Sequence, residues 1–203
     1  HAALVITKVS DAPTAWGEVT LSDTLVLPTG AIFDISAAPS VRAGNDSGSY
    51  RSPFDNDGVS GTFDGGPIDD IEYFAVGPGN LDNPARLQFD SDRTFLGFLW
   101  GSVDGYNSVT FYDENGDSVG VVDNNNISDS ISPSTPGRGA SLVEFNFNEG
   151  ETFRSVEFFS NWNELEFSNT LTSSRGADDP VPATFGLLAV GLIGLGAVAR
   201  RRR

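Results

Sequence analysis

Residues 107–122 read NSVTFYDENGDSVGVV and form the clearest structural signal in the chain. Two runs of strand-forming residues, Ser108–Tyr112 and Ser118–Val122, flank the pair Asn115-Gly116. An Asn-Gly pair between two such runs is a typical signal of a tight β-hairpin turn. We therefore predict two antiparallel strands joined by a short turn.

Short runs of the same kind recur along residues 1–170, each bounded by turn-forming residues. The chain has 23 glycines and 11 prolines among 203 residues, which favours short strands with frequent turns over helices. Within residues 141–147, the side chains of Val143, Phe145 and Phe147 fall on one face of a strand. We therefore expect an all-β domain, a jelly-roll-like β-sandwich. Further strands are expected at Leu4–Val9, Val19–Leu27, Ala31–Ile35, Ile71–Val76, Arg86–Phe89, Phe95–Trp100, Leu142–Phe147, Phe153–Phe159 and Glu164–Phe167.

Charge is distributed unevenly along the chain. The net charge is −16, but 28 acidic and eight basic residues lie at or before Asp179, which leaves this part at −20. The remaining basic residues are Arg200, Arg201, Arg202 and Arg203. A domain with this charge repels nucleic acid and anionic lipid, so nucleic acid is not an expected partner. The domain suits an extracellular role in which divalent cations screen its carboxylates.

The residue types limit the chemistry that the chain can perform. Cysteine is absent, which excludes disulfides, thiol catalysis and cysteine-based metal sites. His1 is the only histidine, so catalytic triads lack a base and a copper site built from two histidines cannot form. Hydrolysis by a pair of carboxylates is compatible with the residue types, but no spacing singles out such a pair. We therefore expect a protein that is not an enzyme.

Two acidic turns are candidate calcium sites. One holds Asp55 and Asp57, and the other holds Asp113, Asn115 and Asp117. Calcium prefers hard oxygen ligands of this kind, although neither stretch has the spacing of an EF-hand loop. Turns require the same residue types on conformational grounds alone. Calcium binding and a purely structural turn therefore stay open as alternatives at both places.

One tryptophan is a candidate ligand-binding residue. Trp162 lies between two asparagines near the end of an expected strand, where an indole ring can stack on a sugar. Trp100 closes an apolar run and is expected in the core. For Trp162, packing in the core or at its rim is the alternative.

The last part of the chain is apolar. Residues 183–199 read ATFGLLAVGLIGLGAVA and carry no charge. As a helix they span about 26 Å, at the short end of what crosses the hydrocarbon core of a bilayer. The arginines at 200–203 follow at once and are expected to stay cytoplasmic. We predict a single transmembrane helix at 183–199, preceded by a flexible linker at 171–179.

A short proline motif precedes this helix, formed by Pro180, Val181, Pro182, Ala183 and Thr184. The order of proline motif, Leu/Gly-rich helix and terminal arginine run resembles the PEP-CTERM tail, a sorting signal read by exosortases in Gram-negative bacteria. The family usually has Glu where this chain has Val181. The resemblance implies an exosortase-type processing enzyme as a partner. It also implies tethering in the inner membrane before processing, followed by a place at the cell surface or outside the cell.

Residues 95–170 also resemble the ectodomains that often precede such tails. The points of resemblance include FLWGS at 98–102 and FFSN at 158–161. This likeness implies a sandwich fold located at the cell surface or in the matrix, with no established chemistry.

We expect a non-catalytic exported protein of the cell surface or the extracellular (biofilm) matrix. The chain has no methionine and begins at His1, as expected once an export signal has been removed. A surface-displayed carbohydrate-binding module that grips exopolysaccharide is one alternative. A homo-oligomer, in which apolar helices pack at the centre of an extracellular filament, is another, and hydrolysis is a third.

Overall fold

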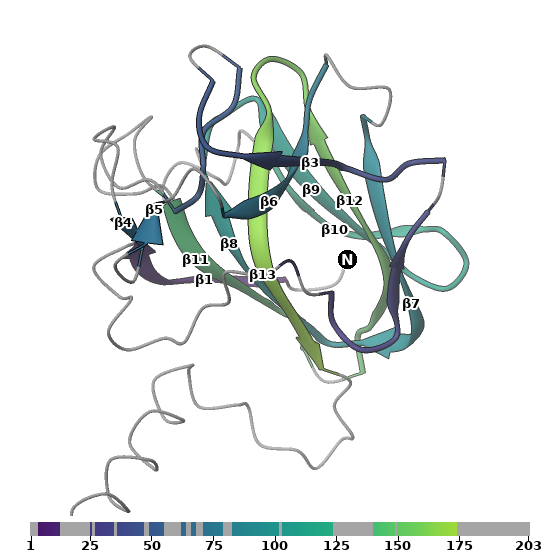
Figure 1. The fold of residues 1–203 in the computed structure, drawn as a ribbon. Coiled ribbons are helices and arrows are strands. Elements are labelled where there is room, and N and C mark those ends of the chain that lie inside the picture. The colour runs from purple at the N-terminus through teal and green to yellow at the C-terminus, as the bar shows by residue number, and fades with distance from the viewer. Residues whose placement is uncertain are drawn as a thin grey trace, which may run out of the picture.

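The computed structural model describes residues 4–12, 25, 27–34, 36–46, 49–54, 62–63, 66–67, 71–78, 83–101, 103–123, 140–148 and 150–173. These residues form two large antiparallel sheets, a two-stranded sheet and no helix (Figure 1). The strands are β1 Val5–Ala12, β2 Ala31–Phe33, β3 Ser40–Ala43, β4 Thr62–Phe63, β5 Gly66–Pro67, β6 Glu72–Val76, β7 Ala85–Arg93, β8 Phe95–Gly101, β9 Asn107–Tyr112, β10 Ser118–Val122, β11 Ala140–Asn146, β12 Phe153–Ser160 and β13 Leu165–Ser173.

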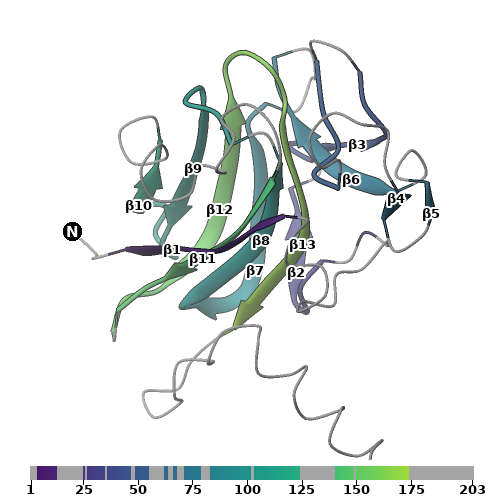
Figure 2. The ribbon, with the colours of Figure 1, turned by 90° about the vertical axis from the view of Figure 1, so that its left-hand side faces the viewer.

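The two large sheets share the strands almost equally. The six-stranded sheet has the order β1-β11-β8-β13-β6-β3, and the five-stranded sheet has the order β10-β9-β12-β7-β2. From β6 to β9 the chain alternates between the sheets, then forms the β9–β10 hairpin, and alternates again from β10 to β13. Most strands therefore pair with partners that are distant in the sequence (Figure 2).

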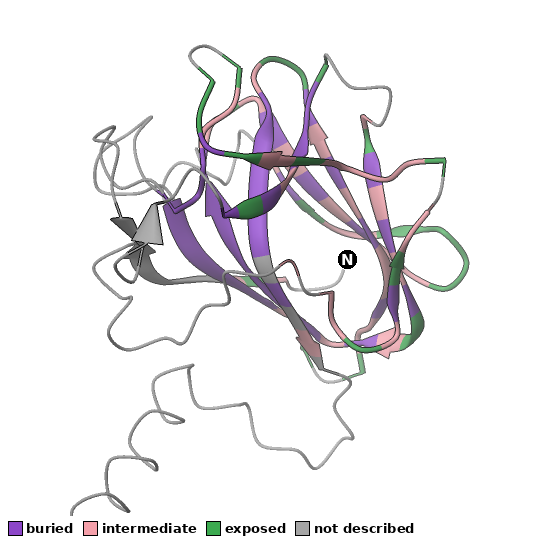
Figure 3. Ribbon diagram, in the orientation of Figure 1, coloured by how far each residue is buried: buried purple, intermediate pink, exposed green. Residues whose placement is uncertain are grey.

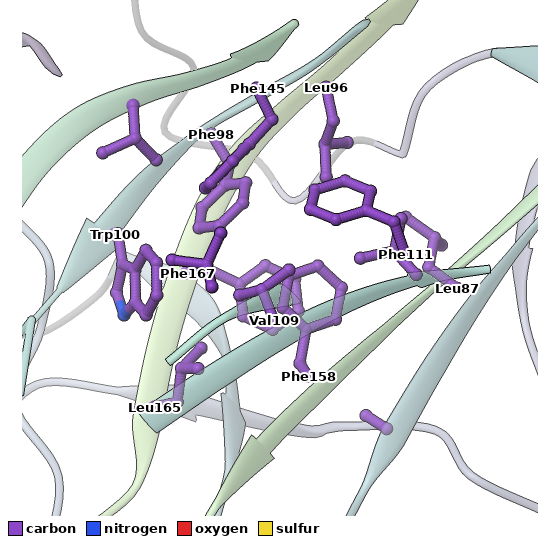
Figure 4. Packing of buried hydrophobic residues seen from close by; sticks show 14 of the residues in the cluster. Leu87, Leu96, Phe98, Trp100, Val109, Phe111, Phe145, Phe158, Leu165 and Phe167 are labelled. Atoms are coloured by element: carbon purple, nitrogen blue, oxygen red, sulfur yellow. The ribbon is translucent and has the colours of Figure 1, made fainter. Parts of the chain in front are cut away.

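The sheets pack face to face through aromatic side chains. Phe158 of β12 stacks on Phe167 of β13, with 4.2 Å between ring centroids, and meets Phe98 of β8 edge-on at 5.6 Å (Figure 4). Each such ring pair contributes about 0.5–1.5 kcal/mol beyond the area that it buries. The side chains along each strand point to alternate faces of the sheet, and this produces the core. In β9, for example, Val109 and Phe111 are buried, while Ser108, Thr110 and Tyr112 are partly exposed.

The centre of the six-stranded sheet is buried on both of its faces. Every residue of β8 is buried, as is most of β11 (Figure 3). Residues 44–46 and 49–54, the covering segment, lie on the outer face of this sheet. Phe54 of the segment belongs to a second apolar cluster with Tyr73 and Leu99, and a Cβ added at Gly101 would lie 3.0 Å from Pro53 Cβ. The outer face therefore has a small core of its own.

The all-β prediction, with two antiparallel sheets, is confirmed for the described residues. The hairpin at 107–122 forms as predicted, with Gly116 at φ 83° in its turn. Ser40–Ala43 was not predicted as a strand, and it pairs with β6 in the structure. Strand β13 ends at Ser173, so it includes the first three residues of the stretch expected as a linker.

Several predictions fall outside the described residues. These are most of the strand expected at Val19–Leu27, most of the linker, and the whole tail from 180 to 203. Among the described residues, no helix has the length and apolar character needed to span a membrane.

Candidate functional site

A polar groove lies on the outer face of the five-stranded sheet. Alternation directs Leu87 and Val156 into the core, and their neighbours Arg86 and Glu157 therefore lie on the opposite face. Glu157 is directly opposite Arg86 in the β12–β7 register, and its Oε2 accepts a hydrogen bond of 2.7 Å from Arg86 Nη2. The pair thus crosses two neighbouring strands.

This pair borders a cavity of about 300 Å³, which we call the β7–β12 groove. Its lining is mostly polar and comprises Asp34, Ser36, Ala37, Asn83, Pro84, Arg86 and Glu157. Volumes of about 300–1,000 Å³ are usual for small-ligand sites, so this groove is at the small end of that range.

One wall of the groove is the segment that follows β2. Backbone hydrogen bonds hold it against β7, from Asp34 N to Arg86 O at 2.9 Å and from Arg86 N to Ala37 O at 2.8 Å. Asp34 Oδ1 accepts hydrogen bonds from the backbone N and the Oγ of Ser36, at 2.9 and 2.7 Å. These bonds are the main reason that the pKa of Asp34 lies below its ordinary value, so this carboxyl is ionised at neutral pH.

An aromatic ring contacts the ion pair of the groove, although it does not line the groove itself. The guanidinium carbon of Arg86 lies 5.0 Å from the ring centroid of Tyr112 on β9, and Tyr112 Oη donates to Glu157 Oε1 at 3.3 Å. The hydrogen bond from Arg86 to Glu157 raises the pKa of the guanidinium further. The groove therefore holds one fixed cation and two carboxylates.

The end of the groove is joined to the loop that follows β12. Asn83 Nδ2 donates to Ser160 O at 2.6 Å, and Ser160 N donates back to Asn83 Oδ1 at 3.3 Å. Ser160 Oγ in turn donates to Asn163 O. Trp162, the candidate predicted from the sequence, lies in this loop and is 69% exposed. Trp100 is fully buried, as predicted.

The candidate calcium residues of the β9–β10 turn lie together and organise that turn. Asp113 Oδ1 accepts hydrogen bonds from the backbone N atoms of Asn115 and Asp117, both at 2.9 Å. These bonds, that of Asp117 above all, lower the pKa of Asp113. Asp55 and Asp57 lie outside the described residues. Among the residues that the structure describes, no group of three or more Asp, Glu or His side chains is arranged to hold a metal ion.

Sequence reasoning missed a buried carboxyl group. Glu166 of β13 is 1% exposed; its Oε1 accepts a hydrogen bond of 2.8 Å from Arg51 N in the covering segment, and its Oε2 has no hydrogen-bond partner among the described residues. Burial raises the pKa of Glu166 well above its ordinary value, and the charges of Glu164 and Asp104 add to the rise. Leu165 and Phe167 point into the core between the sheets, so the side chain of Glu166 lies on the outer face of the sheet. The sequence does not show that this face is buried, because the segment that covers it is distant in the chain.

Neighbouring groups anchor the covering segment to the same region. Arg42 donates to both carboxylate oxygens of Glu164, at 2.9 and 3.2 Å, and Glu164 N donates to Ser49 O at 3.0 Å. Tyr73 Oη donates to Gly44 O at 2.6 Å. Glu166 does not line the β7–β12 groove. These contacts serve to position the segment.

Comparisons with known protein families, with curated proteins and with solved structures give no match for this chain.

Proposed function

We propose that this chain is a non-catalytic exported protein, held at the cell surface or in the extracellular matrix by its C-terminal tail. One observation carries the proposal: the proline motif at 180–184, the apolar run at 183–199 and the arginines at 200–203 follow one another in the order of a PEP-CTERM tail. The last strand of the β-domain ends at Ser173, so few residues separate the domain from the motif.

The charge of the domain supports this location. Residues 1–179 carry −20, which disfavours binding to nucleic acid and keeps crowded copies soluble. The absence of cysteine and the presence of a single histidine leave no conventional nucleophilic site, which supports a role in binding or structure. We assign processing to an exosortase-type enzyme that tolerates Val181 between the prolines.

We also propose that the domain is a jelly roll. The strand orders β6-β13-β8-β11 and β7-β12-β9-β10 support this class, because β6 to β13 alternate between the two sheets except at the β9–β10 hairpin, as in a jelly roll. Strands β1 and β3 extend one sheet and β2 extends the other. The same architecture occurs in lectin domains, which gives the carbohydrate-binding alternative a structural basis.

A second function, carbohydrate binding at the cell surface, is favoured by one specific observation. Trp162 keeps 69% of its surface exposed in the loop next to the β7–β12 groove. An indole ring combines a large apolar face with a polar N–H group, which suits stacking on a ligand. A surface protein with such a module would bind the exopolysaccharide of its own matrix.

The surface location is tested by following the chain in a Gram-negative host that has an exosortase. The full chain, preceded by an export signal, is compared with a truncation after Asp179. We expect the full chain to be accessible to antibody on intact cells, and the truncated chain to appear in the culture medium. Retention of the full chain in the cytoplasm, or equal surface retention of both forms, would contradict the proposal.

A further inference from the structure

We propose that the β7–β12 groove binds a short stretch of a neutral polysaccharide, with Trp162 stacking on a sugar ring at one end. This inference rests on the second function proposed above and names its site and its class of ligand. It is carried by the chemistry of the groove lining, by the net charge of the groove and by the position of Trp162.

The groove offers both donors and acceptors to sugar hydroxyl groups. The guanidinium of Arg86 has five N–H donors, and the hydrogen bond to Glu157 uses one of them. The side chain of Arg86 is 40% exposed, so the remaining donors can be reached from solvent. A carboxylate accepts about four hydrogen bonds. Asp34 already accepts three and Glu157 two, so both keep some acceptor capacity for a ligand, and Glu157 keeps more of it.

These groups are already fixed before any ligand arrives. Ser36 and Gln88 hold the carboxylate of Asp34 from two sides, with Gln88 Nε2 at 3.3 Å from Asp34 Oδ2. Tyr112 and Arg86 hold the carboxylate of Glu157 in the same way. Binding therefore orders few additional side chains, which lowers its entropic cost.

The charges disfavour an acidic ligand. Two carboxylates and one guanidinium leave the groove with a net charge of −1, within a domain at −20. An acidic polysaccharide would be repelled by both the groove and the domain. A volume of about 300 Å³ has room for about one or two sugar rings rather than a folded partner.

Trp162 is within reach of the same ligand. Ser160 is hydrogen-bonded to Asn83 of the groove lining, and Trp162 follows Ser160 by two residues. Two residues of chain span at most about 7 Å, so the backbone of Trp162 lies close to the end of the groove. A polysaccharide that leaves the groove at Asn83 can therefore continue onto the indole ring. Exposed aromatic rings of this kind supply a large contact area at low entropic cost.

A second cross-strand ion pair provides a matched control. Arg154 Nε donates to Asp92 Oδ1 at 2.8 Å, and this pair joins the same two strands, β12 and β7. Its side chains are 36% and 44% exposed, but neither residue lines the groove. Arg154→Gln therefore removes a comparable surface ion pair and leaves the binding site intact.

The test uses the full chain in mild detergent and isothermal titration with cellohexaose, mannohexaose and xylohexaose. Oligogalacturonate serves as the acidic comparison. We expect at least one neutral hexasaccharide to bind and the acidic one to bind more weakly. Arg86→Gln should raise the Kd by about tenfold or more, because hydrogen bonds from charged groups are lost. Arg154→Gln should leave the Kd within about twofold of the parent value.

Trp162→Ala provides an independent variant, because the exposed indole is not part of the hydrophobic core and its removal should leave the fold intact. It should also raise the Kd, and sugar should shift the indole fluorescence of the parent but not that of this variant. An equal loss of affinity in Arg86→Gln and Arg154→Gln would show that the saccharide does not bind in the β7–β12 groove. Unchanged affinity in both Arg86→Gln and Trp162→Ala would show the same. Stronger binding of oligogalacturonate would overturn the ligand class. No binding of any saccharide would overturn the inference and leave the surface location to its own test.

Discussion

The backbone N–H of Arg51 donates a hydrogen bond of 2.8 Å to the carboxyl Oε1 of Glu166, a residue distant from it in the chain. This bond links the covering segment to the buried outer face of the six-stranded sheet. It also leaves a carboxyl group in a site where ionisation is costly, since Glu166 Oε2 has no hydrogen-bond partner among the described residues.

Glu166 should make the stability of the domain depend on pH. Its folded-state pKa lies above the ordinary value of 4.5, so its contribution to the unfolding free energy is complete below about pH 4.5. That contribution is lost as the pH rises through the folded-state pKa. Glu166→Gln replaces the neutral carboxyl with a neutral amide of similar shape, so we expect a smaller loss of stability between pH 4.5 and 8. Urea unfolding of both forms across this range measures the difference.

Two other carboxyl groups affect the pH dependence of stability in the opposite direction to Glu166, and one of them provides a control. The pKa values of Asp34 and Asp113 are lowered, so their contributions are present above about pH 3.8 and are lost as the pH falls below it. In Asp113→Asn, the unfolding free energy should therefore change between pH 4.5 and 8 by the same amount as in the parent chain. An identical pH dependence in Glu166→Gln and the parent would contradict the role of Glu166.

Gly101→Ala should loosen the covering segment. A Cβ at this position would lie 3.0 Å from Pro53 Cβ and 3.1 Å from Pro53 Cα, so the segment would have to move away from the sheet. We expect a lower melting temperature and faster hydrogen exchange at the Arg51 amide. Gly116→Ala is the matched control: its Cβ meets no atom within 4 Å, but its φ of 83° is left-handed. That variant should cost about 1–2 kcal/mol without changing exchange at Arg51. Unchanged exchange at Arg51 in Gly101→Ala would refute the contact.

The calcium prediction for the β9–β10 turn depends on oxygens that the turn leaves available. Asp113 Oδ1 already accepts two backbone hydrogen bonds, whereas Asp113 Oδ2 accepts only a longer one of 3.4 Å from Asn115 Nδ2. A cation would therefore bind through Asp113 Oδ2 and the carboxylate of Asp117. We expect millimolar Ca²⁺ to raise the melting temperature, because a ligand that binds only the folded state stabilises it. Asp113→Asn combined with Asp117→Asn should abolish this rise. If the melting curve in Ca²⁺ is the same as the curve in chelator, the turn does not bind calcium.

Local patterns predicted the parts of the fold that depend on neighbouring residues. The β9–β10 hairpin needs only two alternating runs and a left-handed glycine at Gly116, and all of these are visible in residues 107–122. Strand β3 was missed because its four residues gain their stability from pairing with β6, and the two are separated by about thirty residues. Short strands of this kind carry little signal of their own.

The candidate site was only partly predictable for the same reason. Trp162 was identified from its residue type and its position near a strand end. The structure shows that it is exposed, and its role in ligand binding stays a prediction. Arg86 and Glu157 are separated by 71 positions, and only the β12–β7 register places them opposite each other. The burial of Glu166 likewise depends on a covering segment more than one hundred residues away.

The tail provides the most direct test of the proposed function. Exported protein is collected from the cell surface and from the medium, and its C-terminal peptide is identified by mass spectrometry. We predict a C-terminus near residues 180–184, without Arg200–Arg203, because an exosortase-type enzyme should cleave at the proline motif. An intact Arg203 terminus on protein found outside the cell would contradict processing at this motif and, with it, the sorting route on which the proposed function rests.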